Sequence, residues 1–140
     1  MIPYTARVEN TALSTSNDTM TFVAASTRAL IITAIMLGGM GTASAANSLK
    51  VCRSTGGTTG GGAVTPAPAN PASPAAACSV FTTWSSQPTL GAVLDNISIN
   101  ANGAIVRVPY RIGVPGSGQI SLRSGVGTSN VNCTVHFEEI

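Results

Sequence analysis

Hydrophobic and polar residues alternate with a period of two along most of the chain, which predicts β-strands and no helix of three turns. Residues 4–9 begin the pattern, with Tyr4, Ala6 and Val8 on one face and polar side chains on the other. Residues 131–138 form the clearest strand, with four apolar side chains on one face. Because the first and last strands are both well patterned, we expect them to pair or to be neighbours in one sheet.

Between these two strands the same pattern predicts strands over residues 19–22, 30–37, 48–53, 79–84, 93–99, 104–110 and 118–123. About eight strands separated by turns indicate an all-β, two-sheet antiparallel sandwich. An eight-strand jelly roll is favoured over an immunoglobulin-like sandwich, because Trp84 does not lie suitably between any cysteine pair. We expect one domain over residues 1–140.

Local turn residues refine this prediction. Asn102-Gly103 is a strong hairpin signal between the two strands that flank it. Pro109 and Pro115 indicate an edge position or a bend in the strand that follows, because proline cannot donate to a ladder. Residues 87–91 are expected to turn.

Residues 28–46 resemble a secretory signal, with Arg28, an apolar run and the small residues Ala43-Ser44-Ala45. However, the 27 residues before this segment contain acidic side chains and a strand pattern of their own, and glycines dilute the apolar run. We therefore expect an uncleaved strand over Leu30–Leu37, buried on both faces, and no membrane segment. A secreted β protein with a cleaved signal peptide is a weaker alternative.

Residues 54–77 differ in composition from the rest of the chain. The first part is rich in glycine and threonine, and the second contains Pro66, Pro68, Pro71 and Pro74. No basic residue flanks these prolines, which argues against an SH3-type ligand. A loop of this length inside a domain is usually functional or disordered. We expect an ordered surface excursion that lies against a neighbouring subunit.

Charged residues make up 9% of the chain and give a formal net charge of +2, against roughly 25% charged residues in an average soluble protein. Seven scattered cations do not form a nucleic-acid footprint, and 44% hydrophobic residues argue against disorder. No charge occurs from Ser54 to Leu94. Because charge depletion is typical of interface cores, a homo-oligomer is favoured over a freely diffusing enzyme.

Candidate chemistry is sparse. Cys52, Cys78 and Cys133 lie in apolar runs without a metal-ligand spacing and are expected to be free, buried thiols made in a reducing cytoplasm. His136 falls on the solvent face of its strand, away from any nucleophile elbow. Glu138 and Glu139 point to opposite faces and do not form an acid/base pair. We expect no catalytic site, no cofactor and no metal.

The glycines of residues 56–62 lack the lysine and the strand–loop–helix context of a phosphate loop, so a flexible linker is the better explanation. The arginines are separated along different strands, and we expect them to form inter-subunit salt bridges or hydrogen bonds to carbonyl groups. That prediction covers Arg7, Arg107, Arg111 and Arg123.

Four short motifs resemble small β proteins encoded among the virion genes of tailed bacteriophages. They are Tyr4–Asn10, the proline-rich stretch Thr65–Ala76, the turn Gln87–Gly91 and the closing Val135–Glu139. The resemblance spans nearly the whole chain, and none of the motifs marks a catalytic site. It implies a head decoration (cement) protein.

This resemblance implies a subunit that binds the outside of an assembled phage capsid, with the major capsid protein and copies of itself, as a trimer, for partners. The chain would be made in the bacterial cytoplasm and located on the capsid exterior. The proposed interface residues are Pro66, Pro68, Pro71, Pro74, Tyr4 and Arg7. A tail or fibre module that binds host glycan is the alternative, with Trp84, Tyr110 and Tyr4 as the available aromatic side chains.

Overall fold

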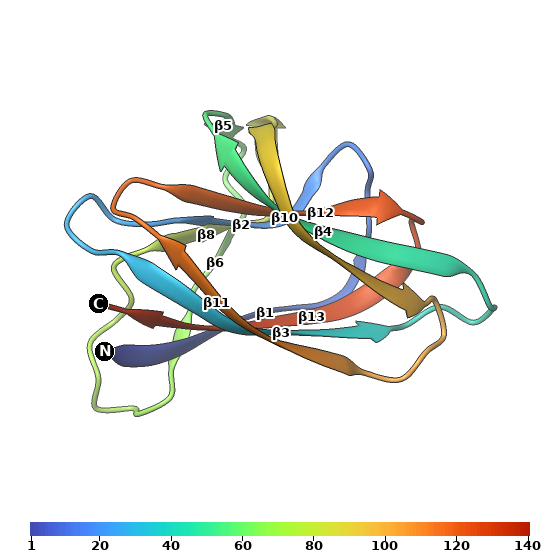
Figure 1. Ribbon diagram of the computed structural model, residues 1–140, viewed down its shortest axis with the longest axis horizontal. Coiled ribbons are helices and arrows are strands. Elements are labelled where there is room, and N and C mark those ends of the chain that lie inside the picture. The colour runs from blue at the N-terminus through green and yellow to red at the C-terminus, as the bar shows by residue number, and fades with distance from the viewer.

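A computed structural model describes residues 1–140 and contains only strands, turns and irregular segments. The strands form two packed layers with the N- and C-termini side by side at one end (Figure 1). Eight strands have six residues or more: β1 (Ile2–Ala12), β2 (Asp18–Val23), β3 (Leu30–Gly39), β4 (Ala46–Thr55), β10 (Thr89–Asn100), β11 (Val106–Val114), β12 (Gln119–Val126) and β13 (Asn130–Glu139). Five are shorter: β5 (Thr58–Thr59), β6 (Ala63–Val64), β7 (Ala67–Pro68), β8 (Ser79–Phe81) and β9 (Trp84–Ser86).

The long strands pair in a nested order. β1 pairs with β13, β2 with β12, β3 with β11 and β4 with β10, all antiparallel. The first sheet has the order β11-β3-β13-β1-β7 and the second β10-β4-β12-β2-β8-β6. The predicted two-sheet antiparallel sandwich, including the pairing of the first and last strands, is confirmed.

Side chains from both sheets meet in one core of 23 buried hydrophobic residues. Phe137 lies at its centre, stacked on Tyr4 at 5.6 Å between ring centroids and edge-on to Phe22 at 5.5 Å. Such aromatic pairs stabilise a core beyond the area that they bury. The three cysteines are free and buried, as predicted from their apolar surroundings.

The apolar segment after Arg28 forms β3, which pairs with β11 on one side and β13 on the other. The strand prediction is therefore confirmed, although its burial differs from the expectation. Leu30, Ile32 and Leu37 are buried on the inner face, whereas Ile31 and Met36 are half-buried on an outer face that no other element covers. No helix in the structure has the length and apolar character needed to cross a bilayer.

Two turn predictions are wrong. Asn102-Gly103 does make a turn, with Gly103 N donating to Asn100 O at 2.9 Å, but β10 and β11 do not pair. The turn passes the chain from one sheet to the other, because β10 pairs with β4 and β11 pairs with β3. Residues 87–91 do not turn throughout, since β10 already begins at Thr89. The edge position predicted from Pro109 is confirmed, as β11 ends its sheet.

Candidate interaction surface

Residues 56–88, here called the strap, join β4 to β10 and contain all five short strands. In the strap, β7 pairs with β1 at one sheet edge, while β8 and β6 extend the other sheet beyond β2. The strap thus covers one side of the sandwich, which we call the closed side. β5 pairs with β9 and projects beyond the two layers (Figure 1).

The four predicted prolines lie on the strap, with Pro66 and Pro68 half-buried and Pro71 and Pro74 exposed. The strap is ordered by main-chain pairing and by hydrogen bonds to the termini, including Ala69 N donating to Pro3 O at 3.0 Å. The expected surface excursion is therefore present, and part of it packs on the chain's own first strand.

The structure corrects the prediction for Tyr4 as an interface residue. Tyr4 is only 1% exposed, with its ring in the core and its hydroxyl donating to Pro74 O at 3.0 Å. Burial raises the pKa of Tyr4, with the nearby Glu139 carboxylate adding to the shift. Arg7 is exposed and forms an ion pair with Glu9 on its own strand. Tyr4 and Arg7 therefore face opposite sides of β1, and a partner could reach only Arg7.

The buried carboxylate of Asp18 anchors the C-terminal end of the strap, residues 84–88. Asp18 Oδ2 accepts hydrogen bonds from Thr21 Oγ1 and Ser121 Oγ, each at 2.5 Å, and Oδ1 accepts one from Arg123 Nε at 2.7 Å. The side chain of Asp18 is fully buried and that of Arg123 is 12% exposed. Burying such a charge is tolerated only when it is paired and hydrogen-bonded.

The strap supplies the cover for this cluster. Trp84 Nε1 donates to Thr21 Oγ1 at 3.1 Å, and Arg123 Nη2 donates to Pro88 O at 3.1 Å. The backbone N–H of Asp18 donates to Gln87 Oε1 at 2.9 Å. The Asp18 cluster therefore ties strap residues 84–88 to the outer face of the second sheet. For Arg123, the predicted bond to a carbonyl group is present, within one chain.

A second buried carboxylate fastens the strap near the C-terminus. Glu139 Oε2 and Oε1 accept hydrogen bonds from the backbone N–H groups of Ala77 and Cys78, at 3.1 and 3.0 Å. Arg28 lies 3.9 Å away and supplies the nearest positive charge. Burial, reinforced by the Glu139 charge and hydrogen bond, raises the pKa of Cys78 to about 12. Glu138 points to the opposite, half-exposed face, as predicted.

The opposite side of the sandwich, here called the open side, ends in the edge strands β10 and β11. Two side-chain links cross it: Tyr110 Oη donates to Asp95 Oδ2 at 2.6 Å, and Arg53 Nη1 donates to Gly113 O at 2.7 Å. The hydrogen bond from Tyr110, followed by that from Asn96 N, lowers the pKa of Asp95. Burial and the Asp95 carboxylate raise the pKa of Tyr110.

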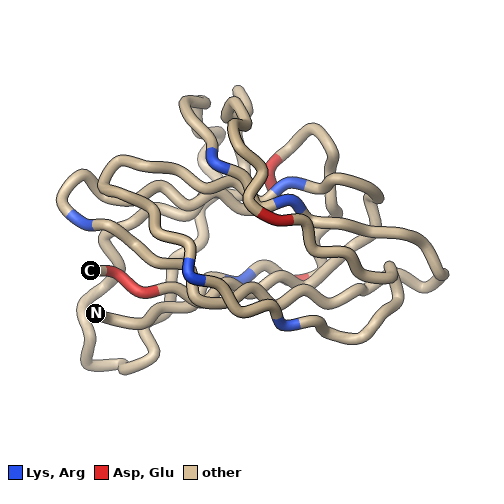
Figure 2. The backbone as a smooth tube through the Cα atoms, in the orientation of Figure 1, with Lys and Arg blue, Asp and Glu red and all other residues tan.

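Ile105, which lies just before β11, and two arginines on the outer face of β11 form a second exposed surface. Arg107 pairs in register with Met36 on β3, which pairs with Thr134 and then Arg7, so all four share this face. Ile105 lies over Gly38 and is 65% exposed. Neither Arg107 nor Arg111 forms a salt bridge. In Figure 2, β11 carries basic residues and no acidic residue.

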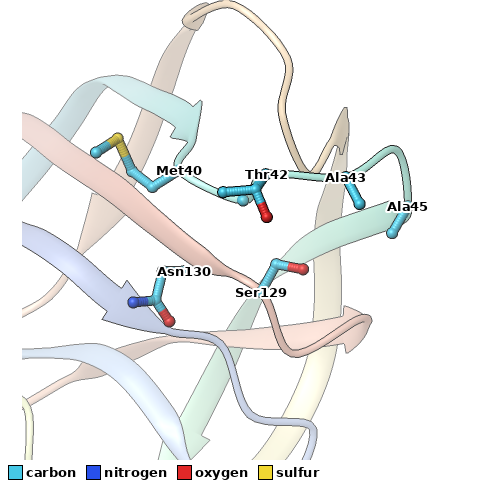
Figure 3. Close-up of a pocket in the computed structure, with 7 residues that line it drawn as sticks. Met40, Thr42, Ala43, Ala45, Ser129 and Asn130 are labelled. Atoms are coloured by element: carbon cyan, nitrogen blue, oxygen red, sulfur yellow. The ribbon is translucent and has the colours of Figure 1, made fainter.

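An open hollow of about 360 Å³ adjoins this face, at the turn between β3 and β4 (Figure 3). Its lining contains methyl, hydroxyl, amide and thioether groups from Met40, Gly41, Thr42, Ala43, Ala45, Ser129 and Asn130. Met40 is 47% exposed, and its sulfur accepts a hydrogen bond from Asn132 Nδ2 at 3.3 Å. We call Ile105, Arg107, Arg111, Met40 and the hollow the β11 surface.

The remaining candidate residues do not converge. His136 is half-exposed on the outer face, with Nδ1 3.2 Å from Thr5 Oγ1. No three His, Cys, Asp or Glu side chains are grouped to hold a metal ion. Of the aromatic residues considered for glycan binding, Tyr4 is in the core, Trp84 lies on the strap and Tyr110 on β11. None of them lines the hollow.

The two buried carboxylates and the β11 surface were not predicted from the sequence. A signal for Glu139 was available, because it continues the inward positions of Val135 and Phe137 at the same spacing of two. For Asp18 the pattern misleads, because a register shift next to it removes it from the face that Met20 occupies. Ile105 lies within the strand predicted over residues 104–110, but β11 begins only at Val106, and Met40 lies beyond the end of β3. The alternating pattern therefore did not show that either side chain is exposed.

Compared with models of known families, with curated proteins and with solved structures, the chain shows no match.

Proposed function

We propose that this chain is a virion structural protein, a decoration (cement) subunit that binds the outer surface of a phage capsid. The observation that supports it best is the nested pairing of the eight long strands, first with last, second with seventh, third with sixth and fourth with fifth. This is the order that a jelly roll would have, and jelly rolls are common in viral capsid domains. The resemblance of four motifs to phage virion proteins points the same way.

The surface chemistry suits a subunit that works by contact. Residues 54–94 contain no charge, and the strap they include presents small Ala, Pro, Ser and Thr side chains. Short side chains lose little conformational entropy when a partner covers them. A protein–protein interface of standard size buries about 1,600 Å², and repetition over a capsid would multiply a modest contact into mechanical resistance. We propose a homotrimer on the capsid exterior.

The direct test is to locate the protein in purified virions. Quantitative proteomics should give a copy number that matches the capsid lattice, and density should lie on the outside of the head. A copy number typical of a tail component would assign the chain to the tail instead. Native mass spectrometry that shows a stable monomer, together with no binding to capsids stripped of this protein, would reject the proposal.

The glycan-binding alternative has no specific observation in its favour. It requires exposed aromatic side chains that share a shallow pocket, whereas Tyr4, Trp84 and Tyr110 lie on separate elements. A glycan array tests it separately.

A further inference from the structure

The β11 surface combines exposed apolar side chains with positive charges that have no partner in this chain. Ile105 lies over Gly38 and is 65% exposed. The sulfur of Met40 accepts a hydrogen bond from Asn132, and Asn132 is the partner of Gly38 in the pairing of β13 with β3. Directly opposed residues of adjacent strands have Cβ atoms about 5 Å apart. The two apolar side chains therefore lie close together, beside the hollow that Met40 helps to line.

The two arginines continue this surface along the same strand. Ile105, Arg107 and Arg111 are separated by two and four residues, and odd-numbered residues of β11 face outward. At about 3.3 Å per residue, the two arginines are about 13 Å apart along the strand. Four of the other five cations have partners, and Lys50 has none. Arg7 pairs with Glu9, Arg28 with Glu139, Arg123 with Asp18, and Arg53 with Gly113 O.

We infer that the β11 surface binds an extended, acidic segment of a partner protein. Two carboxylates four residues apart on one face of that segment would meet Arg107 and Arg111. An apolar side chain two residues before the first carboxylate would lie against Ile105 and Met40. Charge complementarity selects this partner over a second copy, because a second β11 would bring arginine against arginine.

The contact would use side chains and not strand addition. Pro109 has no N–H to donate, and the register shift between Pro109 and Ile112 distorts the ladder. Charged residues, proline and bulges are the devices by which edge strands resist pairing with another strand. The exposed apolar side chains favour a protein over a nucleic acid, for which two arginines would be a small footprint.

This inference rests on the proposed function in one respect: the acidic segment would then belong to the major capsid protein. The test therefore uses a defined probe, the peptide acetyl-Leu-Ser-Glu-Ser-Gly-Ser-Glu-amide, added at millimolar concentration to the ¹⁵N-labelled chain of residues 1–140. We expect chemical-shift changes confined to the amides of Met40, Gly41, Ile105, Arg107 and Arg111. The same peptide with both Glu replaced by Lys should cause none.

Two charge reversals complete the experiment. Arg107→Glu should weaken peptide binding by about fivefold or more, in line with an exposed ion pair. Lys50→Glu is the matched control, because Lys50 lies on β4 in the other sheet, and it should leave binding unchanged. Folding of both variants is checked from the dispersion of their spectra.

Three outcomes would overturn the inference: no shifts at the β11 surface, equal binding of the Lys peptide, or tighter binding of an oligothymidylate of equal charge. Virion location is measured separately. A protein found on the capsid that fails the peptide test would decorate it through another surface, whereas a protein that passes the test but is absent from virions would have a different acidic partner.

Discussion

The closed and open sides of this sandwich differ in how the edges of the two sheets are covered. Each side exposes the edge strands of two sheets, and exposed edges invite unwanted pairing. On the closed side the strap adds main-chain partners to β1 and β2, and two buried carboxylates hold it in place. On the open side only two side-chain links join the sheets, and much of β10 and β11 is exposed.

The difference indicates where this protein can meet a partner. Hydrogen bonds that are buried and charge-assisted are difficult to exchange for contacts with another molecule, because breaking them leaves polar groups without partners. The hydrogen bonds that hold the strap on the closed side are therefore structural, and only exposed residues of the strap, such as Pro71 and Pro74, remain accessible to a partner. The open side retains exposed Val93, Leu94, Ile105 and Val106.

The largest expected effect is on the closed side. Asp18→Ala leaves Arg123 buried without its carboxylate and removes the acceptor of Thr21 and Ser121. Removing one partner of a buried pair costs about 3–5 kcal/mol. Urea unfolding followed by tryptophan fluorescence measures the loss. If Asp18→Ala lowers the free energy of unfolding no more than Arg7→Ala, whose ion pair is exposed, the Asp18 cluster is not a stabilising element.

A smaller loss of stability is expected where the strap passes the C-terminus. In Glu139→Gln, the amide oxygen can accept a hydrogen bond from only one of the two backbone N–H groups of Ala77 and Cys78, because the side-chain NH₂ faces the other one. One unsatisfied buried donor costs about 1–3 kcal/mol. Hydrogen exchange should accelerate at Ala77 and Cys78 more than in the centre of β13. Glu138→Gln, on the opposite face, is the control and should change neither rate.

On the open side the expected loss of folding stability is smaller still. Tyr110→Phe removes the hydrogen bond to Asp95, and we expect a cost of about 1 kcal/mol because the link is only partly buried. The pKa of Asp95 should rise toward its ordinary value, which NMR titration of the carboxyl carbon measures. A pKa that does not move would mean that Tyr110 is not the main cause of its shift.

The sign of the pH dependence follows from the lowered pKa. The contribution of Asp95 is fully present above the pKa of an unfolded aspartate, about 3.9, and is lost as the pH falls through its lower folded value. The stability difference between wild type and Tyr110→Phe should therefore shrink in acid. A difference that stays constant below this range would contradict the assignment.

Two cysteines compare the strap with the core, because Cys78 lies on the strap and Cys133 on β13 in the core. Burial raises the pKa values of Cys78 and Cys133 to about 12, so both are protonated thiols and should resist Ellman's reagent at pH 8. Since both folded pKa values are raised, their stabilising contribution is lost as the pH rises from the ordinary thiol range toward 12.

Local opening of the strap should expose Cys78 before Cys133. Mass spectrometry of the labelled chain in mild urea identifies the first site to react. In Glu139→Gln, Cys78 should react faster while Cys133 is unchanged, because only Cys78 contacts Glu139. Simultaneous reaction of the two thiols would show that the strap opens only with the whole sandwich.

The sequence by itself determined the strands and the faces that they bury. Alternation placed Tyr4 and Ala6 inward on β1 and the four apolar residues of β13 inward, and it identified β3 despite its likeness to a secretory signal. These properties are local, since the period of two fixes which side chains share a face.

Only the tertiary structure decided which edges are covered. The strap's place on β1, the separation of β10 from β11 and the outward displacement of Asp18 all depend on contacts between residues far apart in the sequence. Turn residues report that the chain reverses, but the partner of each strand depends on which long-range pairing buries more of it. At Asp18 a register shift moves the side chain to the outer face, and because only polar residues precede it, the hydrophobic pattern does not reveal the shift.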